Sequence, residues 1–278
     1  MKKIPRLFLK AECFTESQVE LPKKQEHYLK NVLRRRSGSE FVALDGAGRA
    51  WVCALNSGSS ATKVNDFTAC TDHPLALTVG IALCKGARYE GAIEKLAELG
   101  VRELVPLETE RTERKSPSQA KLERWNDIAL SASALAYRLI PMQVRAPMTL
   151  AAFLSQSQKP ICFCHPGGQP SADYFAQATK RLTILIGPEG GFSTDESRVL
   201  ESAADKVDLG PYNLRVETAA TVASGLALNL HSELRDHPQV GSFQRNVMHL
   251  PRPKSDGNYE DVGADHDLRG ISRISKTV

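Results

Sequence analysis

The amino-acid sequence predicts an α/β protein in which a small β domain precedes a larger domain built on a mainly parallel sheet. Two observations lead to this prediction. Residues 40–55 have the pattern of a β-hairpin, and from residue 75 onward short apolar runs alternate with amphipathic helical stretches. Runs that are apolar throughout, without a polar residue at every second position, are typical of parallel strands that helices cover on both faces.

The β domain is expected over residues 1–72. Its hairpin consists of two apolar runs separated by Asp45-Gly46-Ala47-Gly48, residues that readily adopt the backbone angles of a tight turn. A further strand is expected over residues 61–67, and a short helix over residues 27–36. We expect this helix to include three arginines at its end and to stop at Ser37-Gly38.

The larger domain is expected over residues 73–236, with strands at residues 75–84, 101–107, 161–164, 182–186 and 207–210. A helix after the first strand ends at Gly100 and has one apolar face, formed by Ile93, Leu96 and Ala97. The next helix repeats this spacing with Leu122, Trp125, Ile128, Ala129 and Ala132. A final helix from residue 217 to about residue 236 contains Ala219, Ala220, Val222, Ala223, Leu226 and Leu230. Residues 237–278 are polar and unpatterned, so we expect a disordered tail.

The composition narrows the class of protein. The chain has 278 residues and a formal net charge of +4, which is compatible with a nucleic-acid partner but does not establish one. Because no run of 18 apolar residues exists, we expect no membrane span and a cytoplasmic location. None of the six cysteines forms a C-x-x-C pair, so we expect buried free thiols and no metal site.

The most informative segment is residues 182–197, where an apolar strand runs directly into Gly187-Pro188-Glu189-Gly190-Gly191. Ser193 and Glu196 follow with the spacing of a helix-capping box. A glycine loop between a strand and a helix, at the carboxyl edge of a parallel sheet, is a common ligand site. A structural turn is the alternative. A phosphate-binding loop is weaker, because both its Lys-Ser/Thr ending and the G-x-G-x-x-G spacing are missing.

Two further strands end in comparable loops. Residues 207–210 lead through an irregular loop to Arg215 and Glu217, just before the final helix. His165 follows the strand at 161–164 and precedes two glycines. Each feature has a plain structural alternative: an exposed ion pair for Arg215 and Glu217, and a structural role for His165. Loops from one sheet that each end in polar groups nevertheless favour a shared pocket.

Several motifs together resemble the ribosomal RNA small subunit methyltransferase E family of the SPOUT superfamily. The matches, which cover about residues 1–235, are H-x-x-x-V-L-R from His27 to Arg34 with one extra residue, D-G-x-G at 45–48, Glu98-Leu99-Gly100-Val101, Thr109-Glu110-Arg111, Arg124-Trp125, L-I-G-P-E-G-G at 185–191, and L-G-x-x-x-L-R-x-E-T-A at 209–219. The last two motifs are the most specific.

The resemblance implies a PUA-like β-barrel at the N-terminus and a trefoil knot in the C-terminal sheet. It also implies a homodimer that uses S-adenosylmethionine to methylate N3 of one uridine in 16S ribosomal RNA of the small subunit. The residues expected to bind the cofactor are His165, Leu185, Gly187, Pro188, Glu189, Gly190, Gly191, Leu209, Gly210, Leu214 and Thr218. Those expected to bind RNA are Lys30, Arg34, Arg35, Arg36 and Arg111.

The expected catalytic residues are Arg215 and Glu217. Methyl transfer to N3 of uracil requires loss of the imide proton, so a fixed positive charge beside the cofactor would stabilise the resulting anion. Arg215 is the first choice for that charge, and Glu217 would orient Arg215 or bind substrate.

Two segments depart from the family pattern. Ser133-Ala134-Leu135-Ala136-Tyr137 stands where the family has Glu-Gln-x-x-Arg, and Tyr212-Asn213 replaces the polar part of another motif. Both changes remove polar groups from the expected substrate side and leave the cofactor loops intact. Two alternatives therefore stay open: a related SPOUT enzyme acting on tRNA or on a ribose hydroxyl, and a non-catalytic RNA-binding assembly factor.

Overall fold

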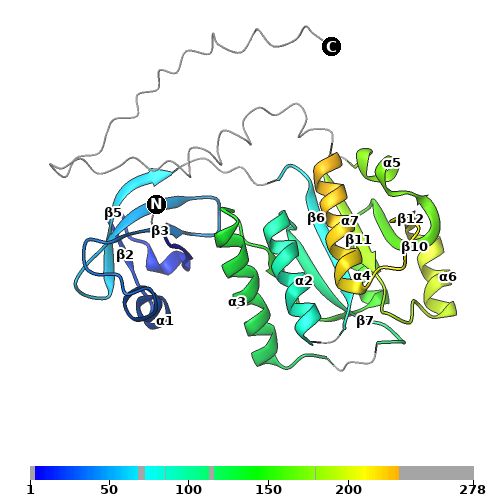
Figure 1. Cartoon of the computed structure of the whole chain (residues 1–278), viewed down its shortest axis with the longest axis horizontal. Helices are drawn as coiled ribbons and strands as arrows, with labels where there is room; N and C mark the ends of the chain where they lie inside the picture. Colours follow the sequence, from blue (N-terminus) through cyan, green and yellow to red (C-terminus); the bar gives the residue numbers. More distant parts are fainter. Residues whose placement is uncertain (1–3, 68–72, 85, 113–115, 179, 232–278) are drawn as a thin grey trace, which may run out of the picture. The chain divides into compact units, whose positions relative to one another are not determined.

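The computed structural model describes residues 4–67, 73–84, 86–112, 116–178 and 180–231 (Figure 1). The expected disordered tail at 237–278 and the expected domain boundary near residue 72 lie outside these ranges, so both stay predictions. Within the described ranges, no helix is both long enough and apolar enough to cross a membrane.

The N-terminal part is a curled half-barrel sheet of five strands: β1 (Arg6–Phe8), β2 (Gln18–Glu20), β3 (Glu40–Leu44), β4 (Ala50–Leu55) and β5 (Ser60–Phe67). The spatial order is β1-β3-β4-β5-β2, with β1 parallel to β3 and the other pairs antiparallel. The predicted β3–β4 hairpin is confirmed. Asp45 closes its turn by accepting hydrogen bonds from the backbone N–H groups of Ala47 and Arg49.

The short helix predicted over residues 27–36 is placed wrongly. The helical segment begins earlier, with α1 (Lys23–His27), and continues as one π-helical turn, η2 (Tyr28–Val32). It ends before the three arginines, because Arg34 has a φ of 51°, which is incompatible with a right-handed helix. The polar run after Pro22 has no apolar periodicity, which is why the start was missed, although proline commonly precedes a helix.

The second sheet is parallel throughout, as predicted. Its seven strands are β6 (Ala76–Ala82), β7 (Glu103–Glu108), β8 (Gln143–Val144), β9 (Met148–Thr149), β10 (Ile161–Pro170), β11 (Arg181–Ile186) and β12 (Asp205–Asp208). The order is β12-β10-β11-β6-β7-β8, and β9 also pairs with β7. The trefoil knot that the resemblance implies stays a prediction.

Helices cover both faces of this sheet. They are α2 (Gly86–Leu99), α3 (Gln119–Leu135), α4 (Leu150–Gln156), α5 (Ser171–Ala176), α6 (Thr194–Ala203) and α7 (Val216–Leu230). One core contains residues of α2, α3, α5 and α7, and the other contains residues of α4 and α6. Figure 1 shows α3, α2 and α7 side by side.

Burial on both faces explains the uninterrupted apolar strands. In β11, Ile184 and Ile186 belong to the first core, whereas Leu185 between them belongs to the second. Each successive side chain is therefore apolar although it points to the opposite face. The predicted apolar faces of α2 and α3 are confirmed, and Gly100 ends α2 with a φ of 111°. The short helices α4 and α5 were not predicted, because neither spans enough residues to show a helical period.

The cysteines are small buried side chains, as expected. Cys13, Cys53, Cys84 and Cys162 are buried and Cys164 is partly buried, and no disulfide joins any of these five. Cys70 lies outside the described residues.

Candidate functional site

Three loops meet at the carboxyl edge of the parallel sheet. Strands β12, β10 and β11 are neighbours and run in the same direction, so the segments that follow them emerge at one edge. These segments are residues 209–214 after β12, the bulge at 165–168 within β10, and the glycine loop, residues 187–191, after β11. The loops predicted from sequence to share a pocket therefore lie on adjacent strands.

The glycine loop requires glycine at two positions for different reasons. A Cβ atom on Gly187 would lie 2.9 Å from the ring of Phe192, so any side chain there would have to displace this buried ring. Gly191 has a φ of 69°, in the left-handed region, and its N–H donates to the carbonyl oxygen of Pro188 at 2.8 Å. Gly190 has room for a methyl group, because its nearest neighbour would be Arg111 Cδ at 3.6 Å.

The predicted capping box is present and has a second role. Ser193 Oγ accepts from the N–H of Glu196 at 3.2 Å, and Glu196 Oε2 accepts from the N–H of Ser193 at 2.9 Å. The other carboxylate oxygen of Glu196 accepts from the N–H of Glu110 at 2.9 Å. Arg111, the next residue, donates from Nη1 to the carbonyl oxygen of Gly190 at 2.8 Å. The turn after β7 is thus fastened to the glycine loop.

Asp208, which sequence reasoning missed, joins the other two loops. Its Oδ1 accepts from the N–H of Gly210 at 2.9 Å, and its Oδ2 accepts from the N–H of Gly167 at 2.8 Å. These N–H donors hold the pKa of the Asp208 carboxyl below its ordinary value. The close approach of β10 to β12 also explains Gly168, where a Cβ would lie 2.6 Å from the backbone of Lys206.

Sequence reasoning also missed Arg88, which joins the predicted residues Glu189 and Glu217 in a charged cluster near the carboxyl end of β6. Arg88, in the first turn of α2, lies 3.8 Å from Glu189 Oε1 in the glycine loop and 3.8 Å from Glu217 Oε1 at the start of α7. The second carboxylate oxygen of Glu217 is shielded from water and has no hydrogen-bond partner among the described residues. Burial, together with the charges of Glu189 and Glu217, raises the pKa of the nearby Cys84 thiol to about 11.

The two residues predicted to be catalytic occupy different surroundings. Arg215 is exposed, is the N-cap residue of α7, and has no ion-pair partner among the described residues. Glu217, where the sequence placed the helix start, is half-buried in the first turn of α7, one residue past the observed start at Val216, and its ion-pair partner is Arg88. The surface ion pair between Arg215 and Glu217 that the sequence left open is therefore absent from the described structure.

Other predicted cofactor residues vary in accessibility. Leu185 is fully buried in the second core, so its side chain is not accessible to a ligand. His165 is exposed, with Nδ1 2.8 Å from the carbonyl oxygen of Pro166. Thr218 is exposed on α7, and Leu209 and Leu214 pack partly against the core.

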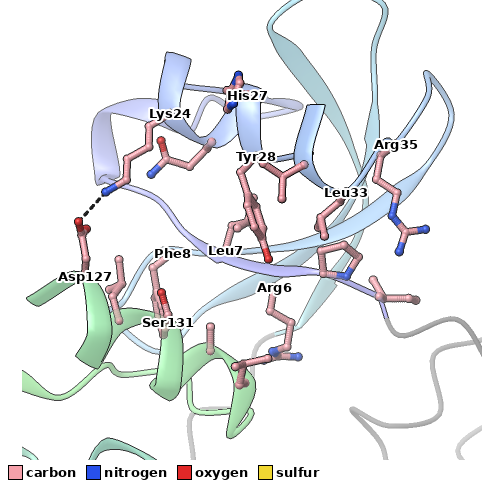
Figure 2. Close-up of a pocket in the computed structure, with 17 residues that line it drawn as sticks. Arg6, Leu7, Phe8, Lys24, His27, Tyr28, Leu33, Arg35, Asp127 and Ser131 are labelled. Atoms are coloured by element: carbon pink, nitrogen blue, oxygen red, sulfur yellow. Dashed lines mark hydrogen bonds and ion pairs between the residues drawn. The ribbon is translucent and has the colours of Figure 1, made fainter. Parts of the chain in front are cut away.

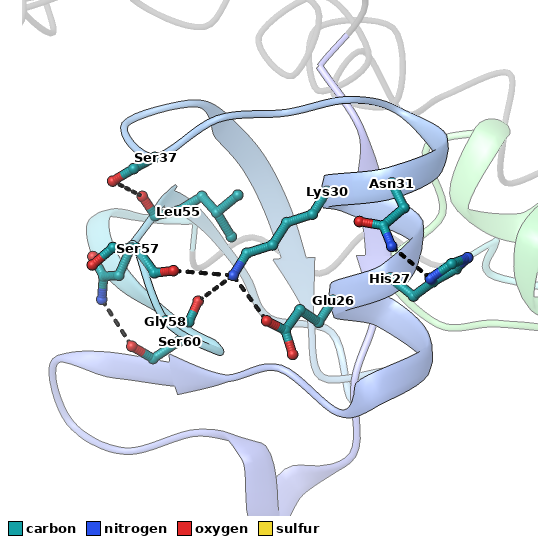
Figure 3. Close-up of polar contacts among 10 residues, drawn as sticks. Glu26, His27, Lys30, Asn31, Ser37, Leu55, Ser57, Gly58 and Ser60 are labelled. Carbon is teal, nitrogen blue, oxygen red and sulfur yellow. Dashed lines mark hydrogen bonds and ion pairs between the residues drawn. The ribbon is translucent and has the colours of Figure 1, made fainter.

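The predicted RNA-binding residues fall into separate groups. Lys30 donates to Glu26 Oε1 at 2.8 Å and to the carbonyl oxygens of Ser57 and Gly58 at 3.2 and 2.7 Å (Figure 3). These contacts tie the helix to the β4–β5 turn and occupy the donors of the ammonium group.

Arg34 and Arg36 are exposed on the half-barrel, whereas Arg35 is only partly exposed. Arg111 lies away from them, at the glycine loop.

Comparison with known proteins agrees with this architecture. Residues 71–228 match the model of an RNA methyltransferase domain, and residues 21–62 match that of an RNA methyltransferase PUA domain. The fold is thus that of an RNA methyltransferase. Ribosomal RNA small subunit methyltransferase E of Synechocystis sp. is 35% identical over 228 residues, which cover 78% of this chain and 75% of the relative. The enzyme of that name from Buchnera aphidicola subsp. Acyrthosiphon pisum is 27% identical over 80% of this chain and 92% of the relative. The chain belongs to the ribosomal RNA small subunit methyltransferase E family.

Solved structures show the same fold. Ribosomal RNA small subunit methyltransferase E from Neisseria gonorrhoeae, bound to S-adenosylmethionine, superposes with a TM-score of 0.75 at 25% identity, covering 82% of this chain and 98% of that one. A Legionella pneumophila protein in complex with the same cofactor gives 0.76 at 26% identity, with the same coverage of both chains.

Proposed function

We propose that the chain transfers a methyl group from S-adenosylmethionine to N3 of one uridine in 16S ribosomal RNA. The observation that supports this most directly is the convergence of three loops, fastened by Asp208 and Arg88, at one edge of the parallel sheet. Family membership supports the reaction class. The two solved relatives that carry S-adenosylmethionine support the cofactor.

The loop cluster fits this cofactor chemically. No hydrogen bond among the described residues uses the backbone of residues 211–214, so the N–H groups of residues 212–214 and the C=O groups of residues 211–214 are available to a purine edge. Leu209, just before that segment, and Leu214, its last residue, offer apolar surface. The carboxylates of Glu189 and Glu217 suit hydroxyl and ammonium groups, and one oxygen of Glu217 has no partner of its own. The predicted backbone contacts of residues 187–191 belong to the same proposal.

The protein's part in the reaction is positioning and charge. S-adenosylmethionine supplies, when bound, a methyl group on a sulfonium that is already a good leaving group. Arg215, exposed at the start of α7, would hold positive charge against the uracil ring as N3 loses its proton. Glu217 is paired with Arg88, so we assign it to orienting the site and not to orienting Arg215. Arg88 is a positioning residue in this scheme.

RNA affinity is assigned mainly to the half-barrel. Arg34 and Arg36 are exposed there and suit phosphate contacts, whereas the three hydrogen bonds of Lys30 favour a structural role. Because N3 is occupied in a base pair, the target uridine must be unpaired or flipped out. We assign Arg111 to an RNA contact near the reaction centre, because its side chain donates to the glycine loop.

The proposal also includes the oligomeric state and the cellular location of the protein. The family resemblance favours a homodimer, which light scattering of the purified chain would detect as twice the monomer mass. A ribosomal substrate favours a cytoplasmic location.

The test is a methyl-transfer assay with labelled S-adenosylmethionine and small ribosomal subunits from a strain that lacks this chain, followed by mass mapping of the modified nucleotide. We expect one 3-methyluridine in 16S RNA. Methylation of tRNA or of a ribose hydroxyl instead would establish the related-enzyme alternative. Cofactor titration that shows no binding would establish the non-catalytic alternative.

A further inference from the structure

A cavity of about 600 Å³ lies away from the loop cluster, between the half-barrel and α3 (Figure 2). Strand β1 and the α1–η2 segment form one wall, and the second half of α3 forms the other. An ion pair between Lys24 Nζ and Asp127 Oδ2, at 2.7 Å, joins the two walls at one end. The volume is in the range of ligand-binding clefts, on the order of 300–1,000 Å³.

Arg6 contributes an uncompensated charge to this cavity. Its Nε and Nη2 atoms are shielded from water and have no hydrogen-bond partner, and no carboxylate of the described residues lies within ion-pair distance of it. The guanidinium carbon stacks 4.8 Å from the centre of the Tyr137 ring. Burial lowers the pKa of Arg6 to about 10, so the group is still charged at neutral pH. A cation without a counter-charge in such surroundings is unfavourable, and an anionic oxygen from a ligand would relieve it.

Exposed apolar side chains gather at the same place. Five large hydrophobic residues are exposed among the described residues, and three of them line this cavity: Tyr28 at 41%, Val32 at 58% and Leu135 at 59%. The Tyr28 ring points toward Arg6 across the cavity in Figure 2. Apolar residues that cluster at a cleft are typical of a binding surface, whereas scattered ones need no explanation.

The charge balance distinguishes between possible occupants. The lining contains Arg6, Lys24 and Arg35 as cations and Asp127 as the single carboxylate, which Lys24 neutralises. The charge of Arg6 is therefore left without a carboxylate partner among the described residues, beside an aromatic and aliphatic surface. A nucleotide combines a flat apolar base with a negative phosphate and matches both properties, whereas an apolar peptide matches only one.

We propose that this cavity binds one unpaired nucleotide of the substrate RNA, with the base against Tyr28 and Val32 and a phosphate oxygen at Arg6. The inference rests on the proposed function, since it assumes an RNA substrate. It adds a subsite on the half-barrel side that is separate from the loops that hold the cofactor. Arg6 and Tyr28 would then anchor the RNA, and Arg34 and Arg36 would add phosphate contacts around them.

The test is the affinity of the full chain for a labelled single-stranded RNA decamer, measured by fluorescence anisotropy without cofactor. Tyr28→Ala should weaken binding about tenfold, as expected for loss of one stacked base, and Tyr28→Phe should bind like the unmodified chain. Arg6→Gln should weaken binding and lower the log–log salt slope by about one. Val199→Ala and Arg198→Gln, which change an exposed apolar residue and an exposed arginine of α6, are the matched controls and should change neither quantity.

Equal RNA affinity for Tyr28→Ala and the unmodified chain would overturn the proposal. Because Tyr28 is exposed, this variant should fold, and the test therefore stands even if Arg6→Gln does not fold. If the variants bind the decamer normally but no longer bind intact small subunits, the cavity contacts a protein partner, and the proposal is also overturned. A change in oligomeric state would indicate a second copy of the chain, with the same consequence. Failure of the proposed function would appear separately, as absent cofactor binding or methyl transfer in the unmodified chain.

Discussion

The Nε atom of Arg88 lies 3.8 Å from Oε1 of Glu217, so the first turn of α2 is linked to the first turn of α7. The same guanidinium lies 3.8 Å from Glu189 in the glycine loop. One cation therefore separates two carboxylates that would otherwise repel each other at the carboxyl end of β6. Because Glu217 is half-buried, loss of this partner would leave its carboxylate with less solvation than an exposed carboxylate has.

Removal of this cation should disturb cofactor binding more than folding. Arg88→Gln leaves Glu189 and Glu217 without their counter-charge, so we expect S-adenosylmethionine affinity to fall about fivefold, equivalent to roughly 1 kcal/mol. Calorimetry on Arg88→Gln, Glu217→Gln and the double variant would measure the coupling. Arg198→Gln removes an exposed arginine outside the site and is the control. Strictly additive effects of the two changes would show that the pair is not coupled.

The glycine loop gives a steric prediction. Gly190→Ala should fold and bind cofactor almost normally, because the added methyl group meets Arg111 only at 3.6 Å. Gly190→Val adds bulk where the backbone is proposed to contact the ligand, so affinity should fall about tenfold or more with little change in melting temperature. Calorimetry would measure the affinities. A Gly190→Val protein that binds as well as Gly190→Ala would remove this position from the site.

Asp208 provides a test of the link between the two other loops. An asparagine at this position offers one acceptor oxygen where the carboxylate offers two, so either Gly167 or Gly210 loses its hydrogen bond. We expect Asp208→Asn to weaken cofactor affinity about fivefold, since the loops are then less fixed. Asp205→Asn is the control, because Asp205 is on the same strand and bonds to Tyr174 instead. If both variants bind cofactor equally well, Asp208 does not organise the site.

The exposed arginines give a salt-dependence prediction. Each phosphate contact that is removed lowers the log–log slope of RNA affinity against salt by about one. The double change of Arg34 and Arg36 to glutamine should therefore lower the slope by about one to two, measured on small-subunit RNA. The matched control changes Arg198 and Lys95, two cations on other helices. A slope as high as that of the control would assign RNA binding to another surface.

The elements that sequence predicted well are those that local chemistry determines. Interactions between residues close in sequence determine the hairpin turn at Asp45 and the capping box of Ser193 and Glu196. Burial of both faces determines the apolar strands. Arg88 was missed because its partners, Glu189 and Glu217, are distant in the chain. The sequence of an amphipathic helix does not indicate which of its arginines will pair with a carboxylate from another element. Lys30 was expected to bind RNA because the sequence shows its charge but not the two carbonyl groups of the β4–β5 turn that it meets.

The final prediction concerns Arg215, the exposed N-cap residue of α7. If its charge stabilises the uracil anion, Arg215→Ala should cut single-turnover methyl transfer about a hundredfold while cofactor affinity stays nearly unchanged. Arg215→Lys should restore only part of the rate, because an ammonium group cannot reproduce the planar donor fork. Arg215 makes no side-chain capping bond, so its removal should scarcely alter the melting temperature. Single-turnover assays on small ribosomal subunits, run with saturating RNA, separate the chemical step from binding. A near-normal rate for Arg215→Ala would make the residue structural and would transfer the catalytic assignment to Glu189 or His165, the remaining polar side chains of the loop cluster that were predicted to bind cofactor.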